Sequence, residues 1–412
     1  MSERAAGLDR DDPLARFRGE FVFEEGGPLY VDGNSLGRLP LRARKRIGAL
    51  MDEWSTELVR GWHRWIDLPT AVGDLLGRDV LGARPGETLV CDSVTVNLYK
   101  LAGAALATRP GRRVVATDRT NFPTDRYVLA GLDAELRLFD PDPVAGPSAE
   151  DVAAACASGD VALVALSHVA YRSGALADLR AITAAAHDAG ALVLWDLSHS
   201  AGAVEVGLAE RDVDLAVGCT YKYLCAGPGA PAFLYVRRDL QEELRSPIQG
   251  WFGQRDQFAM ERDYEPAEGI GRFLAGTPPI LGLAAVEVGA ELVGEAGITA
   301  VAEKARALTS FGVERFDARL APLGLELGTP RDAERRGAHL AFRHGEDAWR
   351  ICRALIERAE VVPDFRGPDT IRFGFPPLAT SFADVEESVD RLAEVVESGL
   401  HLDLDPRPAR VT

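Results

Sequence analysis

Three polar segments of the 412-residue chain each follow a short apolar run, and they contain side chains that could do chemistry. The first segment contains Asp196, at the end of the apolar run 191–196, with His199 three residues later. A buried carboxylate at a sheet edge is costly unless it has a partner, and a protonated ring nitrogen is a suitable one. The sequence leaves open the alternative that Asp196 only caps the next helix.

The second segment contains Lys222, which lies between Tyr221 and Tyr223 and precedes the glycine-rich residues 226–231. A lysine held between aromatic neighbours on a tight loop is partly desolvated, which favours the neutral amine that attacks an aldehyde. The glycines allow the backbone to approach a bulky ligand closely. A loop lysine taken alone is usually a solvated surface residue, so the chemical interpretation depends on Asp196.

The third segment, residues 92–97, joins the apolar run 88–91 to a helical pattern. Free backbone N–H groups and hydroxyls at a helix N-terminus can bind phosphate, although the same residues could serve only as an N-cap. Pyridoxal 5'-phosphate requires a lysine for its Schiff base, a carboxylate at its pyridine nitrogen and a phosphate site. Lys222, Asp196 and the 93–97 turn together predict that cofactor.

The elements that must position these residues follow from the apolar pattern. Seven short apolar runs predict strands at 88–91, 113–117, 135–139, 161–166, 191–196, 215–218 and 232–236. Helical segments such as 97–107 and 178–189 alternate with them, which predicts an α/β fold with a mostly parallel seven-stranded sheet covered by helices on both faces. Ligands of such sheets bind beyond the carboxyl ends of the strands.

The flanking regions predict two further units. An extended run at 28–32 and a helix at 41–58 form an N-terminal arm, and a long helix is expected at 279–294. Helices at 299–320, 346–359 and 382–399 and a strand at 370–375 predict a smaller α+β C-terminal domain. The expected division of the chain is 1–58, 59–285 and 286–412.

Composition excludes several classes of function. A formal net charge of -17, from 46 basic and 63 acidic residues, disfavours nucleic acid and anionic membranes as partners. The five cysteines form no CxxC pair or zinc-type cluster, so neither a disulfide framework nor a structural metal is expected. The start of the chain has no apolar signal core, and no run reaches the ~18 apolar residues of a membrane span, so we expect a cytoplasmic protein.

Seven motifs occur in a fixed order along the chain. They are DGNSLG at 32–37, TVN at 95–97, FPTD at 122–125, WDLSHSAGA at 195–203, YKYL at 221–224, GWFG at 250–253 and GTPPI at 276–280. With these motifs the sequence resembles the kynureninase family, pyridoxal-phosphate hydrolases of the aminotransferase class V group with fold type I. The resemblance extends to the segment around Arg372 and so covers nearly the whole chain. One departure is Gln254, where the family pattern has histidine after GWFG.

The resemblance implies roles for individual residues. The cofactor-binding residues would be Val94, Thr95, Phe122, Asp125, Asp196, His199, Tyr221, Lys222, Trp251 and Thr277, with Trp251 supplied by the partner subunit of a homodimer. The substrate-binding residues would be Asn34, Trp62, Gly276 and Arg372, with Arg372 on the α-carboxylate and Trp62 at the aromatic end. The catalytic residues would be Lys222, Tyr221 and Asp196.

The implied reaction is hydrolysis of L-kynurenine to anthranilate and L-alanine in tryptophan catabolism, with 3-hydroxykynurenine, which gives 3-hydroxyanthranilate, as a second candidate substrate. A class V aminotransferase or cysteine desulfurase is an alternative, although the one late cysteine, Cys352, falls within a predicted helix. A catalytically silent binding protein and an enzyme acting on a substituted kynurenine are further alternatives. His168 has either a structural or a catalytic role, and His187, His339, His344 and His401 have no ligand spacing.

Overall fold

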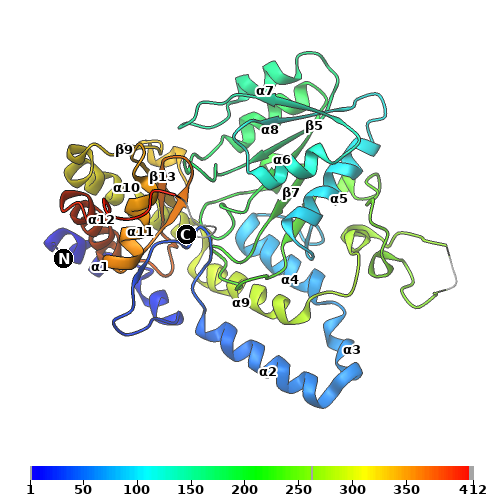
Figure 1. Cartoon of the computed structure of the whole chain (residues 1–412). Coiled ribbons are helices and arrows are strands. Elements are labelled where there is room, and N and C mark those ends of the chain that lie inside the picture. The colour runs from blue at the N-terminus through cyan, green and yellow to red at the C-terminus, as the bar shows by residue number, and fades with distance from the viewer. Residues whose placement is uncertain (1, 261–262, 408–412) are drawn as a thin grey trace.

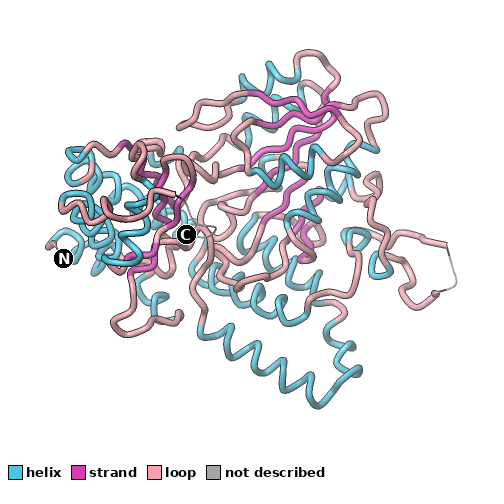
Figure 2. Tube along the Cα trace, in the orientation of Figure 1, coloured by secondary structure: helices cyan, strands magenta, loops and turns pink. Residues whose placement is uncertain are grey.

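A seven-stranded sheet crosses the larger part of the molecule in the computed structural model, which describes residues 2–260 and 263–407 (Figures 1 and 2). Its strands are β2 (Thr88–Val90), β3 (Val114–Asp118), β4 (Glu135–Phe139), β5 (Val161–Ser167), β6 (Leu192–Asp196), β7 (Leu215–Gly218) and β8 (Phe233–Val236), in the order β2-β8-β7-β6-β5-β3-β4. β8 runs antiparallel to both of its neighbours, β2 and β7, and all other neighbouring strands of this sheet are parallel. The predicted mostly parallel sheet is confirmed, strand by strand.

Helices cover both faces of this sheet. They are α4 (Leu68–Leu76), α5 (Val94–Ala107), α6 (Pro123–Ala130), α7 (Ala149–Cys156), α8 (Leu179–Asp188) and α9 (Ile280–Ala296). Alternate residues of β6 enter different cores, since Val193 and Trp195 pack with α4, α8 and α9 whereas Leu192 and Leu194 pack with α5. Burial on both faces explains why the strands read as continuous apolar runs. We call the sheet and these helices the large domain.

A small domain contains a four-stranded antiparallel sheet in the order β12-β13-β10-β9 (Figure 2). Its elements are α10 (Ile298–Arg319), β9 (Glu326–Leu327), β10 (His339–Arg343), α11 (Ala348–Arg358), β11 (Val361–Val362), β12 (Asp364–Arg366), β13 (Thr370–Gly374) and α12 (Phe382–Glu397). The sequence predicted its helices and the strand that became β13, but it missed β9 to β12.

The N-terminal segment packs on the small domain. The helix α1 (Glu3–Asp11), which the sequence did not predict, lies against α12 (Figure 1). The short strand β1 (Leu29–Tyr30) pairs in parallel with β11, and Ala5 and Val31 are buried in the small-domain core. The helix α2 (Leu41–Glu57) and the single turn α3 (Trp62–Trp65) then lead to the large domain. No described helix is both long and apolar enough to span a membrane.

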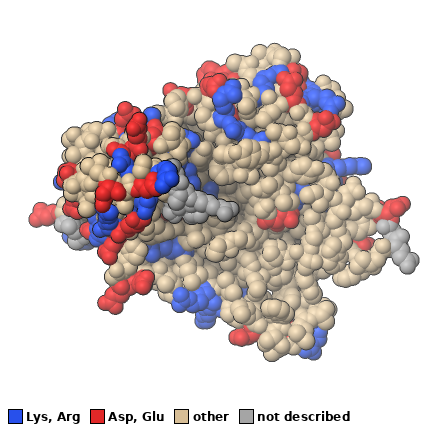
Figure 3. All heavy atoms as spheres, in the orientation of Figure 1, with Lys and Arg blue, Asp and Glu red and all other residues tan. Residues whose placement is uncertain are grey.

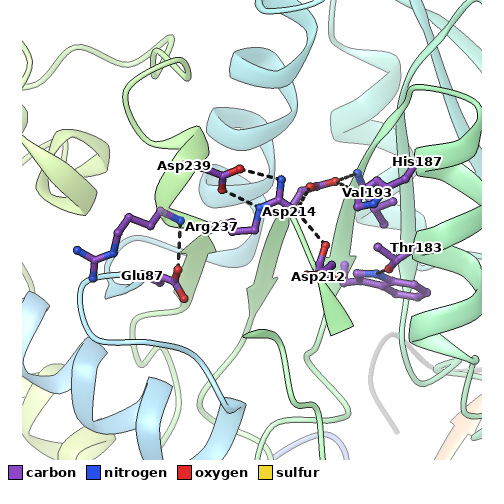
Figure 4. A network of polar contacts seen from close by, with 10 residues as sticks. Glu87, Thr183, His187, Val193, Asp212, Asp214, Arg237 and Asp239 are labelled. Atoms are coloured by element: carbon purple, nitrogen blue, oxygen red, sulfur yellow. Dashed lines mark hydrogen bonds and ion pairs between the residues drawn. The ribbon is translucent and has the colours of Figure 1, made fainter. Parts of the chain in front are cut away.

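A buried carboxylate fixes the central strands at the edge opposite the candidate site (Figure 4). Asp214 precedes β7 and is fully buried. One of its oxygens accepts from the backbone N–H of Val193 at 2.9 Å and lies 2.8 Å from Nε2 of His187, while the other lies 2.8 Å from Nη1 of Arg237. Asp214 therefore ties β6, α8 and the end of β8 together.

Candidate active site

A cavity of about 220 Å³ opens at the carboxyl edge of the large sheet. It is lined by eight residues that the sequence predicted for the cofactor: Val94, Thr95, Phe122, Asp125, Asp196, His199, Tyr221 and Lys222. The register of the sheet explains the convergence, because Ser167 of β5, Asp196 of β6 and Val217 of β7 are direct neighbours across the strands. The loops that follow these three strands therefore meet at one place.

The loop of Lys222 is closed by short contacts on both sides. The hydroxyl of Thr220 donates to the carbonyl of Pro231 at 2.7 Å, which joins the lysine loop to the end of the glycine-rich segment. The N–H of Gly37 donates to the carbonyl of Tyr221 at 2.8 Å. A Cβ atom at Gly37 would lie 2.2 Å from the carbonyl oxygen of Lys222, so only glycine allows this approach. The DGNSLG motif thus packs directly against the lysine.

The phenol of Tyr221 lies beside the amine of Lys222, with Nζ 5.9 Å from the ring centre. Burial, with a smaller contribution from Cys219, raises the pKa of Tyr221 above its ordinary value. The phenol therefore keeps its proton at neutral pH and can donate it within the cavity.

Asp125 and Asp196 face each other in the cavity wall, with 2% and 7% of their surfaces exposed. Burial, reinforced by the neighbouring Asp196, raises the pKa of Asp125 well above its ordinary value. Two carboxyl groups this close share a proton unless a cationic N–H group lies between them. The protonated ring nitrogen of pyridoxal phosphate is such a group, so the pair fits the predicted cofactor.

Asp196 and His199 share no hydrogen bond. Oδ1 of Asp196 accepts from the backbone N–H of Ser198 at 2.7 Å, which is a local turn contact of the capping type. Nδ1 of His199 is buried without a hydrogen-bond partner in the described residues. Burial, followed by the charge of Lys222, lowers the pKa of His199 well below its ordinary value, so the imidazole is neutral. His199 still lines the cavity.

The turn before α5 is the candidate phosphate site that the sequence suggested. Ser93 caps the helix, its hydroxyl accepting from the N–H of Val96 at 3.3 Å, and Val94 and Thr95 occupy the first turn. Free N–H groups at such a turn suit a phosphate dianion. Here the cap and the candidate phosphate site coincide, so the two interpretations left open by the sequence are compatible.

Lys100 holds this turn in place and was missed by the sequence analysis. Its fully buried amine lies 2.7 Å from Oδ2 of Asp92 and 2.7 Å from the carbonyl of Phe273. Asp92 has a positive φ of 48°, an uncommon backbone conformation that the ion pair helps to fix. The available signal was one lysine in the middle of the otherwise largely apolar helix α5.

Phe122 is held at the cavity mouth by residues that the sequence analysis did not select. Oδ1 of Asn121 accepts from the N–H of Phe122 at 2.8 Å and from the hydroxyl of Ser167 at 2.7 Å. The ring of Tyr171 lies edge-on to Phe122, with centroids 5.3 Å apart. Phe122 is 39% exposed, which leaves a ring face available for a flat ligand.

Arg372 and Asn34 are buried beside the cavity, where the small domain meets it. Nε of Arg372 donates to Asp364 at 2.7 Å, and Nη1 donates to the carbonyl of Tyr171. Asn34 is fully buried with both polar side-chain atoms unpartnered in the described residues. It packs tightly on Gly374, where a Cβ atom would lie 1.9 Å from its Oδ1. Both residues adjoin the cavity without lining it.

The four other predicted residues lie outside the cavity of the single chain. Trp62 lines a separate apolar hollow of about 380 Å³ between α2, α3 and the start of α9. Trp251 is 41% exposed, and Gly276 and Thr277 are also exposed. Gln254 has a local role, because its Oε1 accepts from the N–H of Glu265 at 2.7 Å.

The amino-acid sequence is similar to those of known proteins over nearly its whole length. Residues 301–392 match the family model of the kynureninase C-terminal domain. The chain is 43% identical to the kynureninase of Pseudomonas fluorescens, over 95% of this chain and 94% of that protein. The kynureninase of Burkholderia pseudomallei (strain 1106a) is 42% identical, over 96% of this chain and 95% of that protein.

The chain belongs to the kynureninase family. Its predicted class, a pyridoxal-phosphate-dependent hydrolase, is thereby confirmed. A solved C-DES mutant with glycine covalently linked to its PLP cofactor has the same fold, with a TM-score of 0.79 at 18% identity over 92% of this chain and 99% of that one. The fold-type-I prediction is confirmed as well.

The cysteine desulfurase alternative finds little support in the positions of the cysteines. A desulfurase requires an accessible loop cysteine, whereas Cys352 is fully buried in α11. All five cysteines of the chain are buried and free. Among the described residues, no three His, Cys, Asp or Glu side chains form a group that could hold a metal ion.

Proposed function

We propose that the protein hydrolyses L-kynurenine to anthranilate and L-alanine, with 3-hydroxykynurenine as a second candidate substrate. The supporting observation is the cavity that collects Lys222, the carboxyl pair of Asp125 and Asp196, and the turn at Val94 in a chain of the kynureninase family. Pyridoxal phosphate, when bound, supplies an electron sink for the bonds at the α- and β-carbons of the substrate.

Each of these residues has a task that its surroundings support. The amine of Lys222 attaches the cofactor and then, once released, moves the proton of the substrate α-carbon. Asp125 and Asp196 accept the pyridine N–H, and the turn with Val94 and Thr95 binds the phosphate. Water adds to the carbonyl carbon and supplies the second oxygen of the anthranilate carboxylate. The phenol of Tyr221, protonated and beside the lysine, donates the proton that the substrate β-carbon needs when its bond to that carbon breaks.

Arg372 is proposed to bind the substrate α-carboxylate. Asp364 holds the guanidinium through both Nε and Nη2, while Nη1 donates to the carbonyl of Tyr171, whose loop lines the cavity. Because Nη1 carries a second N–H, it can donate a charge-assisted hydrogen bond to the substrate carboxylate. Asn34, unpartnered and buried beside it, is proposed as a neighbouring polar contact of the substrate.

A homodimer is proposed to complete the site. The exposed apolar side chains Trp54, Leu58 and Val59 lie at the end of α2 and just beyond it, and Leu281 begins the neighbouring α9. Figure 3 shows charged side chains gathered over the small domain and the top of the large domain, while the remaining face is mainly uncharged. A partner chain covering this face would bring its own Trp251 and Thr277, with Gly276, to the cavity and would shield Trp62. Light scattering of the purified protein tests the dimer.

A cytoplasmic location is part of the same proposal. All five cysteines are free, which suits a reducing compartment. Cell fractionation with an antibody to the protein tests the location.

The direct test mixes cofactor-loaded protein with L-kynurenine and follows anthranilate fluorescence, with 3-hydroxykynurenine measured in parallel by absorbance. We expect rapid product formation and a fall of at least ~10³-fold for Lys222→Ala, because that change removes both the cofactor attachment and the proton carrier. Lys45→Ala, an exposed lysine on α2, is the control and should keep full turnover. If neither substrate gave product although the cofactor was bound, the proposal would be contradicted and a substituted kynurenine would be favoured as the substrate.

A further inference from the structure

A second cavity, of about 330 Å³, lies between the two domains and is separate from the active site. It is bounded by the start of α8 in the large domain and by the middle of α10 and the segment before β10 in the small domain. Five arginines line it: Arg180, Arg211, Arg306, Arg335 and Arg336. This is an unusual concentration of positive charge in a protein whose net charge is -17.

Arg336 is the decisive residue, because its guanidinium is buried without a counter-ion. Only 2% of the residue is exposed, and its nitrogens donate to the hydroxyls of Thr309 and Ser310 and to the carbonyls of Pro330 and Arg331. All of these acceptors are neutral. Within residues 2–260 and 263–407, no carboxylate oxygen lies within 4.0 Å of it.

A buried charge with only neutral partners is costly, and an anion nearby offsets that cost. Burial lowers the pKa of Arg336 below its ordinary value, because the charged guanidinium is less stable away from water. The guanidinium nevertheless stays charged, because arginine does not lose its proton at physiological pH. The carboxylate of Asp332 acts on Arg336 only from beyond ion-pair distance, and the cavity that Arg336 lines has room for a closer anion.

The other cationic groups around the cavity leave room for such an anion. In the described part of the chain, Arg180, Arg211 and Arg335 have no carboxylate within ion-pair distance, and Arg211 donates only to the carbonyls of Glu205 and Val206. Arg306 is the exception, since it lies 3.3 Å from Glu334.

Each acidic side chain of the lining already has a partner. Asp178 caps α8 by accepting from the N–H of Ala181 at 3.0 Å, and Glu205 accepts from the hydroxyl of Thr299. Glu334 faces Arg306. Five arginines against these three carboxylates leave a net positive lining.

A buried imidazole completes the cavity wall. His168 is 2% exposed, its Nδ1 lies 2.9 Å from the hydroxyl of Ser200, and its ring packs on Trp195. Burial lowers the pKa of His168 to about 3, so a neutral ring, which can still donate one N–H, faces the cavity. The preceding residue, Ser167, lines the active-site cavity, so the two cavities lie on either side of one strand end.

We infer that this cavity is a binding site for a small dianionic oxyanion, such as phosphate, sulfate or a dicarboxylate, which bridges the two domains. Guanidinium groups bind such anions in pairs of parallel hydrogen bonds. The site joins segments that already meet, because the N–H of Leu176 donates to the carbonyl of Arg335 and the N–H of Gly337 donates to the carbonyl of Gly174. The anion therefore fastens the junction between the domains.

The test uses the full-length protein loaded with pyridoxal phosphate, so that the phosphate turn at α5 is already filled. Calorimetric titrations with sodium phosphate, sulfate and malonate are compared with sodium chloride at equal ionic strength. We expect saturable binding of at least one dianion, a rise in the thermal midpoint that follows saturation, and no saturable effect of chloride. The anion that binds most tightly distinguishes a phosphate site from a dicarboxylate site.

Arg336→Met is the obvious variant, but removing this buried residue could unfold the protein. The double variant Arg180→Ser/Arg335→Ser instead changes two exposed arginines of the cavity and should weaken dianion binding at least tenfold. The matched control is Arg10→Ser/Arg44→Ser, which removes the same charge from exposed positions on α1 and α2 and should bind as the unchanged protein does. Equal affinity in both double variants, or no binding beyond that of chloride, would overturn the inference.

Discussion

The carboxyl groups of Asp125 and Asp196 lie next to each other in the wall of one cavity, although one belongs to α6 and the other ends β6. Without a cation between them, this pair holds a proton that it would not hold in the unfolded chain. The consequence is a stability that depends on pH and on the cofactor.

We expect Asp125→Asn to stabilise the cofactor-free protein at pH 8 by about 1–2 kcal/mol. The raised pKa of Asp125 means that the folded state binds more protons than the unfolded state above about pH 4, so stability falls as pH rises. Asparagine removes this penalty, and the gain should therefore vanish as the pH falls towards 4. Urea denaturation between pH 4 and 8 measures it.

Asp52→Asn, an exposed change on α2, is the control and should show no such pH dependence. The same Asp125→Asn protein should bind pyridoxal phosphate more weakly, because one acceptor at the ring nitrogen has lost its charge. A variant that is less stable than the unchanged protein at pH 8 would show that the two carboxyl groups do not repel each other.

Gly37→Ala should weaken cofactor binding at least ~10-fold, which corresponds to the 1–3 kcal/mol that overpacking commonly costs. The added Cβ would meet the carbonyl oxygen of Lys222 at 2.2 Å and Sγ of Cys225 at 2.5 Å, so the lysine loop must shift. Equilibrium titration with pyridoxal phosphate, followed by its absorbance, measures the change.

We expect the opposite effect from Gly48→Ala, which should stabilise the protein. Gly48 lies inside α2, and a Cβ atom there would meet nothing within 4 Å. Alanine should therefore add about 0.5–1 kcal/mol of stability and leave cofactor binding unchanged. Equal cofactor affinities in the two variants would refute the steric argument for Gly37.

Lys100→Met should destabilise the protein by about 3 kcal/mol, because it leaves Asp92 and the carbonyl of Phe273 without their buried cationic partner. The adjoining phosphate turn should loosen as well, so the affinity for pyridoxal phosphate should fall. Chemical denaturation and cofactor titration measure the two effects.

A double variant separates the buried ion pair from the packing of the lysine stem. Asp92→Asn/Lys100→Met removes both charges, and asparagine tolerates the positive φ of position 92. We expect it to recover a substantial part of the stability that Lys100→Met loses. Strict additivity of the two single changes would mean that the pair contributes no coupling.

His187→Gln should cost about 1 kcal/mol at pH 5.5 and little at pH 9. The hydrogen bond to Asp214 raises the pKa of His187, so the imidazolium is favoured in the folded state. This stabilisation is complete below the ordinary histidine pKa of about 6.5 and disappears as the pH rises through the higher folded-state value. Thermal or urea unfolding at several pH values reveals the trend.

His63→Gln is a matched control, because His63 is exposed on the single turn α3. It should change stability equally at both pH values. If the cost of His187→Gln instead grew with pH, the ring would be acting as a neutral hydrogen-bond partner of Asp214.

Sequence patterns predicted the large sheet because six of its seven strands are short runs buried on both faces, the edge strand β4 being the exception. The strands of the small domain escaped prediction for physical reasons. β9 and β11 have only two residues each, and β10 mixes the polar His339 and Arg343 with apolar neighbours. Strands this short depend on their pairing partners, which lie far away in the sequence.

The residues of the candidate site likewise include some that sequence patterns could predict and some that they could not. Residues at strand ends, such as Lys222 and Asp196, could be found because the fold itself places them together. The neutral state of His199 could not be inferred, since it depends on burial by neighbours including His339, whose ring lies 5.2 Å away. Lys100 was missed because one of its partners, the carbonyl of Phe273, lies 173 residues away, where no local pattern shows it.

Helices α1 and α12, which are far apart in the sequence, meet in the small domain. Asp9 of α1 accepts from the N–H groups of Phe382 and Ala383 at the start of α12, and the N–H of Ser2 donates to Glu386. During synthesis α1 is made long before α12, so α1 cannot dock on α12 until the ribosome has passed Glu397. The large sheet, whose last strand ends at Val236, can form earlier. Assembly of the small domain therefore follows that of the large sheet.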